Sequence, residues 1–449
     1  MFVSTLANKK QLFQLTWPIF FEAVLFSVIG SVDVMMLSNY ADNAVGGVGA
    51  VNQVLSLFAV VSNIITAGTG ILCAQYIGAG KTMEEKQPLI MGSLLVNGLL
   101  GILFSLAAVF CGDLLLNLVN IDRELRPYAL EYLRIVGGFL FLQMIAMTFY
   151  VVIRSHGKTR ATMIFSLVMN LINVVLNYVL IYGKFGLPRL GVSGAAVATV
   201  VSKCFSCGVA GFYLFRFVLP GFSLRLRWKP MLRSIRTVLA YGSPAAGEQI
   251  SYTLSKLVVM AMVNSLGAVT ANAYTYLNTV TGYVYLFSMA LGQGTSIMVG
   301  WEAGKKQTRQ AKQICLFSVR CSFLIAMGAV GILCLVRRPL MGLFTQNEQI
   351  IALGAAAILT DFLLEAGRSR NLVLVNALRA AGDVRFPLYI GLVSMWLFSV
   401  GFSWLLGIAL GWGLVGIWIA LGLDECCRAI AMQLRWQKGT WTKFIGKET

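Results

Sequence analysis

The sequence predicts an all-α polytopic membrane protein whose twelve transmembrane helices form two pseudo-symmetric six-helix lobes. Of the 449 residues, 58% are hydrophobic and only 12% are charged, whereas about 25% of residues are charged in a typical soluble domain. Apolar runs long enough to cross a bilayer recur along the whole chain, with short polar gaps between them. In addition, residues of the first half recur in the same order 222–226 positions later.

Each predicted helix coincides with an apolar segment of spanning length. Met1 to Gln14 leads directly into the first of them, so we expect this helix to remain as an anchor rather than to be cleaved as a signal peptide. The segments are 16–38, 48–77, 88–112, 128–153, 161–183, 191–217, 241–265, 270–300, 311–336, 351–377, 386–409 and 412–436.

Lys and Arg residues predict the orientation of these helices, because short cytoplasmic loops retain positive charge. Most of them fall in the termini and in the loops that follow even-numbered helices, as do Lys10, Lys158 and Arg309. Both termini are therefore predicted to be cytoplasmic. This topology accounts for the net charge of +18, and we expect no nucleic-acid partner because no basic block belongs to a soluble module.

The internal repeat predicts the domain organisation: an N-lobe at 1–218, a basic cytoplasmic linker at 219–238 and a C-lobe at 239–449. Six helices per half place both halves in the same orientation, related by an axis along the membrane normal. Two such bundles on either side of a cleft suit alternating access. The matching sets are Pro18 and Glu22 with Pro244 and Glu248, Gly68 and Gly70 with Gly292 and Gly294, Arg154 and Gly157 with Arg379 and Gly382, and Gly191 and Gly194 with Gly413 and Gly416.

Two carboxylates, Glu22 and Asp33, lie in the first predicted span. A charge inside a span costs at least about 2.5 kcal/mol and usually marks a functional site, which makes Asp33 the first candidate. In the fifth helix Asn170, Asn173 and Asn177 share one face, and Asp33 and Asn177 are predicted to reach the same depth and meet there. The alternative is a satisfied hydrogen-bond network between helices that has no transport role.

The second half carries further charges within its spans. Glu248 and Lys256 fall in the seventh helix, and Asp361 and Glu365 share a face of the tenth, where Arg368 is placed to form an ion pair with Glu365. A purely structural role would explain much of this cluster of charges. Glu248 occupies the repeat position of Glu22, and whether the two acids gate, bind substrate or brace a proline bend stays open.

The eighth helix is rich in Tyr, Phe and Met, and Tyr283 is a candidate to line an adaptable cavity for flat apolar or cationic ligands. Such residues also serve as core or as a lipid-facing surface. The nine Cys residues lie without His partners, so no metal site is expected. The sequence shows no phosphate-binding loop and no paired nucleophile and base within the spans. These features predict neither an enzyme nor a cofactor, and leave an ion gradient as the energy source.

Several segments together resemble the bacterial type of multidrug and toxic compound extrusion (MATE) transporters, and the resemblance covers nearly the whole chain. It implies the MATE architecture of the MOP superfamily and places proton or sodium coupling on Asp33, with Asn173 nearby. The second-lobe acid of some members falls on Glu248. The segments are Pro18 with Asp33, Gly68–Lys81, Asn170–Ala196 and Asn376–Asp383.

The chain departs from many relatives at one position that bears on the ion. Where they have an acid followed by Pro, it has Asn177 and Tyr178. Asp33 is then the main protonatable group of the first lobe, which favours H+ over Na+. The tenth helix shows a second departure. One branch of the family has an acid closer to the segment that begins at Asn376, whereas this chain has the segment Glu365–Arg368.

The resemblance implies a monomeric antiporter of the bacterial inner membrane, surrounded by lipid, that exports small organic cationic or amphipathic compounds. An alternative keeps the architecture and changes the cargo to an endogenous metabolite such as a flavin, or to a lipid-linked sugar. A lipid-linked cargo needs a basic opening toward lipid, for which Lys203, Lys256 and Arg320 are candidates.

Overall fold

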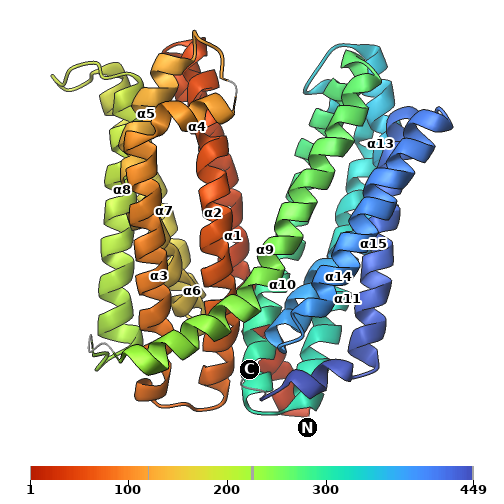
Figure 1. Cartoon of the computed structure of the whole chain (residues 1–449). Coiled ribbons are helices and arrows are strands. Elements are labelled where there is room, and N and C mark those ends of the chain that lie inside the picture. Colours follow the sequence, from red (N-terminus) through yellow and green to blue (C-terminus); the bar gives the residue numbers. More distant parts are fainter. Residues whose placement is uncertain (1, 120, 224–226, 447–449) are drawn as a thin grey trace. The chain divides into compact units, whose positions relative to one another are not determined.

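The computed structural model describes residues 2–119, 121–223 and 227–446, and every regular element in these ranges is a helix (Figure 1). The long elements of the first half are α1 (Phe2–Ser38), α2 (Asp42–Gly78), α3 (Met83–Phe110), α5 (Arg126–Gly138), α6 (Leu140–Ser155), α7 (Thr159–Tyr182) and α8 (Val192–Tyr213). Those of the second half are α9 (Trp228–Ser265), α10 (Ala268–Gly304), α11 (Thr308–Leu335), α13 (Glu348–Ala380), α14 (Arg385–Ser394) and α15 (Gly413–Gln437). The short elements are α4 (Gly112–Leu118), α12 (Arg337–Gly342), the π-helices η1 (Leu214–Val218) and η2 (Met395–Ala409), and the 3-10 helix η3 (Thr440–Phe444).

These helices account for the twelve predicted spans. Eight are long and apolar enough to cross a membrane when η1 and η2 are counted as continuations of α8 and α14. The predicted span 128–153 is the pair α5 and α6, which is bent by 50°. The remaining three, α9, α10 and α15, are 38, 37 and 25 residues long and more polar than the others. The twelve-helix all-α fold is therefore confirmed.

Several helices are longer than their apolar segments. α1 begins at Phe2 instead of 16, and α9 begins at Trp228 instead of 241, because a helix continues into polar sequence beyond the bilayer-length run. The second part of the predicted linker 219–238 is consequently the first turns of α9. Residues 224–226, with Arg225, lie outside the described residues.

The chain divides into two compact units. The N unit comprises Phe21–Cys73 and Lys81–Ser243, and the C unit comprises Met1–Phe20, Ala74–Gly80 and Pro244–Thr449. Two helices that contribute to both units, α1 and α9, carry Pro18 and Pro244 close to the division, where a helix loses a backbone hydrogen bond and bends. The predicted lobe boundaries at 218 and 239 stay a prediction.

In the N unit, a buried apolar cluster holds the helices that carry the first candidate site. Leu37 of α1 and Ile181 of α7 belong to it, and each lies one helical turn after a polar residue of interest, Asp33 or Asn177. Residues four apart share a helix face, so the apolar contacts fix the register of the polar ones. Close backbone packing adds to this, since a Cβ atom on Gly242 of α9 would clash with the carbonyl oxygen of Ile64 of α2.

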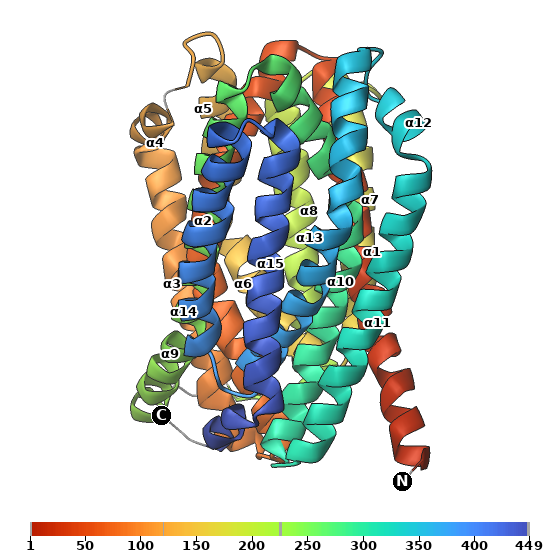
Figure 2. The ribbon, with the colours of Figure 1, turned by 90° about the vertical axis from the view of Figure 1, so that its right-hand side faces the viewer.

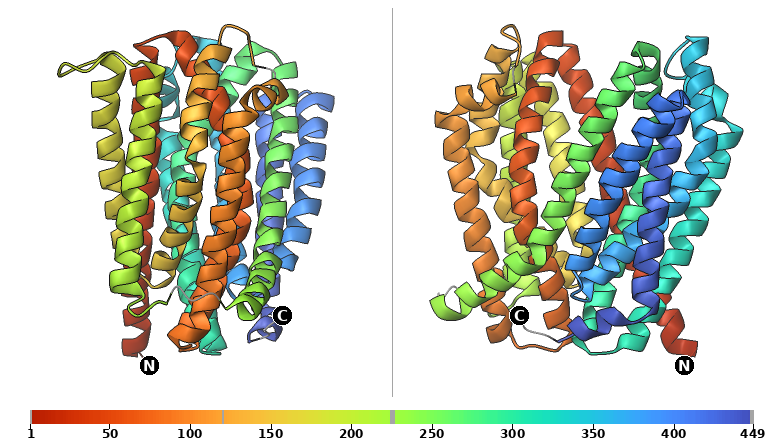
Figure 3. Two further views of the ribbon diagram at one scale, coloured as in Figure 1. Left: turned by 60° about the vertical axis from the view of Figure 1, so that its left-hand side comes forward. Right: turned by 45° about the vertical axis from the view of Figure 1, so that its right-hand side comes forward.

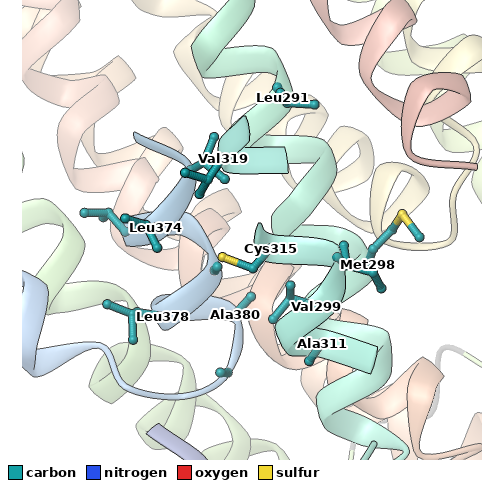
Figure 4. Close-up of a cluster of buried hydrophobic side chains, with 14 of the residues drawn as sticks. Leu291, Met298, Val299, Ala311, Cys315, Val319, Leu374, Leu378 and Ala380 are labelled. Atoms are coloured by element: carbon teal, nitrogen blue, oxygen red, sulfur yellow. The ribbon is translucent and has the colours of Figure 1, made fainter. Parts of the chain in front are cut away.

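The core of the C unit is formed by α10, α11 and α13. Leu291, Cys315 and Leu374, one from each helix, are fully buried and pack together in Figure 4. α13 and α15 also pack along each other in the C unit (Figures 2 and 3). Charged side chains on this contact are therefore enclosed between helices.

Candidate functional site

Asp33 of α1 faces the row of asparagines on α7. Its Oδ1 accepts a hydrogen bond of 2.8 Å from Nδ2 of Asn177, and the same amide donates to Oδ1 of Asn173 over 3.2 Å. Asn170, Asn173 and Asn177 are all buried, as their spacing on one helix face predicted. The predicted meeting of Asp33 and Asn177 is confirmed, whereas a role of either residue in transport stays a prediction.

Two further helices complete this arrangement. When the Asn173 amide nitrogen is turned toward Asp33, it lies 3.1 and 3.3 Å from the two carboxylate oxygens. The amide also lies 3.5 Å from the hydroxyl of Thr199 on α8, which interacts with the hydroxyl of Tyr132 on α5. These five residues form the Asp33 site. Neither Thr199 nor Tyr132 was predicted as a site residue, because each is an isolated polar group among apolar neighbours.

Charge distinguishes Asp33 from the other acids within the helices. In the described chain no Lys or Arg nitrogen lies within 4 Å of its carboxylate, and the side chain is half-buried. Asp361 of α13 also has no such ion pair, but it is fully buried and accepts a hydrogen bond of 3.0 Å from Nε1 of Trp418. Asp33 is therefore a carboxylate within the first span that is only half-buried and has no cationic partner among the described residues.

The acids Glu22 and Glu248 form equivalent ion pairs in the two repeats. Glu22 of α1 lies 2.7 Å from Arg154 of α6, and Glu248 of α9 lies 2.5 Å from Arg379 of α13. Each pair connects the first helix of a repeat with its fourth. Neither acid is part of the Asp33 site, and whether the two acids gate, bind substrate or brace a proline bend stays open.

The two ion pairs differ in the residue that contacts the acid in addition to the arginine. Ser166 of α7 donates a hydrogen bond of 2.7 Å to Glu22. Its counterpart 225 residues later is Gly391 of α14, where a Cβ atom would lie 3.2 Å from Cγ of Glu248. Glu22 thus has two donors, whereas Glu248 has only the Arg379 guanidinium among the described residues.

A larger group of charges is enclosed in the C unit. The predicted pair Glu365–Arg368 is confirmed at 2.7 Å. On α15, Arg428 lies 2.8 Å from both Asp424 and Glu425, and all three are buried. Each ion pair lies within one helix, α13 or α15, and lowers the cost of burying its charges between the two helices.

The remaining candidates, Lys256 and Tyr283, lie in different environments. Tyr283 is 52% exposed, whereas Tyr274 of the same helix is buried against Trp418, so the aromatic residues of α10 do not share one surface. Lys256 lines a small cavity inside the C unit, which we call the Lys256 cavity. Its polar lining is Tyr252, Ser255, Lys256, Arg368, Ser399, Asp424 and Glu425.

Comparison with known proteins agrees with this architecture. A family model, MatE, matches residues 18–179 and again 244–405, which are the two repeats. The uncharacterized transporter YisQ of Bacillus subtilis is 36% identical over 96% of this chain and 94% of its own length. A probable multidrug resistance protein NorM of Thermotoga maritima is 28% identical over 97% of this chain and 93% of its own.

Solved structures share the fold. The MATE transporter VcmN of Vibrio cholerae superimposes with a TM-score of 0.89 at 18% identity, over 97% of this chain and 98% of that chain. The resemblance seen in the sequence is thereby confirmed. Because the family model covers both repeats, the protein belongs to the MATE family of multi-pass membrane transporters.

Proposed function

We propose that the protein exports organic, often cationic or amphipathic, small molecules in exchange for an ion that moves inward, with Asp33 as the coupling group. The observation that carries this proposal is the half-buried Asp33 carboxylate, which has no Lys or Arg nitrogen within 4 Å among the described residues and whose hydrogen-bond partners are the amides of Asn177 and Asn173. Such partners hold a carboxylate in place in both its charged and its protonated form, because an amide both donates and accepts hydrogen bonds.

The proposed ion is H+ in preference to Na+. The Asp33 site holds one carboxylate, since the fifth-helix position nearest to it is Asn177. A single acid takes up one proton without further ligands, whereas a hard cation favours several oxygen ligands. In the proposed cycle, uptake of the ion at Asp33 changes the contacts between α1 and α7 and weakens substrate binding, and alternating access then returns the site to the cytoplasm.

The topology and setting are also part of the proposal. In this proposal the protein works as a monomer in the bacterial inner membrane and both of its termini lie in the cytoplasm. The distribution of Lys and Arg supports the location of the termini. The names of the NorM relatives support a multidrug cargo. The positions of Lys203 and Lys256 give no support to a lipid-linked cargo, because Lys203 is bonded to Gln143 and Lys256 lines an internal cavity.

The test is efflux of ethidium or norfloxacin from proteoliposomes of controlled orientation, under an imposed proton gradient and then a sodium gradient. We expect proton-driven transport by the wild type and its loss in folded Asp33→Asn. Unimpaired transport by Asp33→Asn would remove the coupling role. A folded wild type that transports neither compound under either gradient would redirect the search to a metabolite such as a flavin or to a lipid-linked sugar.

A further inference from the structure

The Lys256 cavity occupies the position in the second repeat that the Asp33 site occupies in the first. Val259 lies 226 residues after Asp33, Ser399 lies 226 after Asn173, and Leu421 lies 222 after Thr199, in agreement with the offsets of their helices. All three counterparts line the cavity. The free volume is about 10 Å³, which is roughly the space that one water molecule needs.

The sign of the charge on the first helix of the repeat is reversed between the two places. The acid Asp33 is replaced by apolar Val259, while Gly30, one turn earlier, is replaced by Lys256. On the sixth helix the change runs the other way, because Lys203 of the first repeat corresponds to Glu425. The second repeat therefore carries a cation where the first repeat has an open glycine position.

The carboxylates that line the cavity carry more charge than their arginine neutralises. Arg428 is paired with both Asp424 and Glu425, at 2.8 Å each, so one negative charge of this trio is left over. Ser399 and Asn371 donate further hydrogen bonds, of 2.8 Å to Asp424 and 2.9 Å to Glu425. These neutral donors hold the acids in place without cancelling the remaining charge.

Lys256 is the available counter-charge. Arg368, the other cation of the cavity, is paired with Glu365 at 2.7 Å. The Lys256 ammonium lies 5.6 Å from the centre of the Tyr252 ring and has no carboxylate within 4 Å in the described chain. A cation in this place faces the surplus charge of Asp424 and Glu425 across a space of one water molecule, and such a water can bridge the groups.

We propose that the ammonium group of Lys256 is a tethered cation that fills the second-repeat counterpart of the Asp33 site, so that the C unit takes no ion from solution. The inference rests on the proposed function for its consequence, which is that one coupling ion, bound in the N unit, moves per cycle. Without the lysine, the oxygens of Tyr252, Ser399, Asp424 and Glu425 form a lining suited to a monovalent metal cation.

The test is sodium binding to purified protein, measured in the Asp33→Asn background so that the first-repeat site does not contribute. We expect no sodium response with Lys256 in place. Lys256→Ala should bind 22Na+ and gain at least about 2 °C in Tm between sodium-free buffer and about 0.1 M NaCl, with choline chloride as the control salt. Lys256→Arg should behave like the parent, and Glu425→Gln added to Lys256→Ala should abolish the gain.

Two outcomes obtained with folded protein overturn the proposal. One is a folded Lys256→Ala protein that does not bind sodium. The other is sodium binding by the Lys256 parent that Glu425→Gln removes, since the site would then be open to solution ions. If Lys256→Ala does not fold, Lys256→Met combined with Glu425→Gln must restore the folded yield, because charge balance is restored; failure to do so also overturns it.

This experiment is independent of transport. A wild type that is inactive in efflux leaves the sodium result unchanged, and an unchanged sodium response leaves the role of Asp33 in efflux unchanged. The two proposals therefore fail separately.

Discussion

The Asp33 site and the Lys256 cavity lie at matching positions of the two repeats and differ in how their charge is balanced. At Asp33 the carboxylate contacts Asn177 and Asn173 and has no cation within 4 Å among the described residues. In the second repeat, buried acids are paired with arginines and faced by Lys256. The same scaffold thus leaves the Asp33 carboxylate without a cation among the described residues, whereas the acids that line the Lys256 cavity are paired with Arg428.

This difference is the basis of the proposed division of labour, in which the N unit takes the coupling ion and the C unit takes none. A carboxylate that needs a partner responds to an ion from solution, whereas a cluster that supplies its own cations is stable without one. The equivalent pairs Glu22–Arg154 and Glu248–Arg379 show that other positions kept the same chemistry in both repeats. The repeats thus keep some charged positions and change others.

The largest expected effect comes from removing the central cation of the C unit. Arg428→Met leaves Asp424 and Glu425 without their arginine, and breaking a buried pair in this way costs about 3–5 kcal/mol. Its repeat counterpart in the N unit is Ser206, which is 2.7 Å from the hydroxyl of Tyr150; Ser206→Ala should cost only about 1 kcal/mol. Thermal unfolding in detergent measures both.

A matched control separates charge from packing in that experiment. Adding Asp424→Asn and Glu425→Gln to Arg428→Met removes the uncompensated charges and should recover most of the lost stability. If Arg428→Met unfolds at the same temperature as Ser206→Ala, the two units do not differ in the energetic weight of their charges.

The next effect tests whether a lysine closes the Asp33 site as Lys256 is proposed to close its counterpart. No atom lies within 4 Å of a Cβ atom built on Gly30, and residues three apart on a helix are neighbours. Gly30→Lys should therefore place an ammonium beside Asp33 and reduce the initial rate of gradient-driven efflux more than about tenfold, or about 1.4 kcal/mol.

Gly30→Met, which has a side chain of similar size without the charge, should keep at least about half of the rate, so that loss in the lysine variant reflects charge. Equal rates for the two folded variants would show that a nearby cation does not compete with the coupling ion.

A third effect, on stability alone, distinguishes the two Glu–Arg pairs. Arg379→Met removes the only described donor of Glu248, whereas Arg154→Met leaves Ser166 bonded to Glu22. A hydrogen bond to a charged group contributes about 1.5–3 kcal/mol, so we expect Arg379→Met to be the more destabilising by about 1.5 kcal/mol. Chemical unfolding of both variants measures the difference.

Adding Ser166→Ala to Arg154→Met makes the first pair resemble the second, and its loss of stability should approach that of Arg379→Met. A single Ser166→Ala variant reports the serine contribution alone. If Arg154→Met is as destabilising as Arg379→Met while Ser166 is present, the serine contributes nothing to the asymmetry.

Much of the fold follows from patterns that the sequence carries openly. Apolar runs of spanning length predict the helices, and recurring residues such as Pro18 and Pro244 predict the repeat. The bend between α5 and α6 and the early start of α9 at Trp228 were not predicted. Both depend on how a helix packs against others, which hydropathy along one segment does not record.

The sites were predictable to the extent that their residues share a helix. The spacing of Asn173 and Asn177 on α7 indicated the face that meets Asp33, and the spacing of Glu365 and Arg368 indicated their ion pair. Thr199 joins from another helix without any periodic pattern. The Lys256 cavity draws on α9, α13, η2 and α15, so its charge balance appears only once the helices are packed.

The smallest expected effect concerns His156, the one histidine of the chain, which lies at another position where the two repeats differ. His156 follows α6 and its counterpart 225 residues later is the fully buried Ala381. Burial lowers the pKa of His156, and nearby Lys86 lowers it further, against a backbone hydrogen bond to Val152 that raises it. The unfolded chain therefore binds more protons than the folded one just below the ordinary histidine pKa.

It follows that the stability contributed by neutral His156 is present above about pH 6.5 and is lost as the pH falls through the lowered value. His156→Ala, which copies the second repeat, should flatten the dependence of Tm on pH between about 5 and 7, with a smaller change in stability than Arg428→Met or Arg379→Met produces. Tm values of both proteins over this range measure it. Parallel curves would mean that His156 is as accessible to protons in the folded protein as in the unfolded chain.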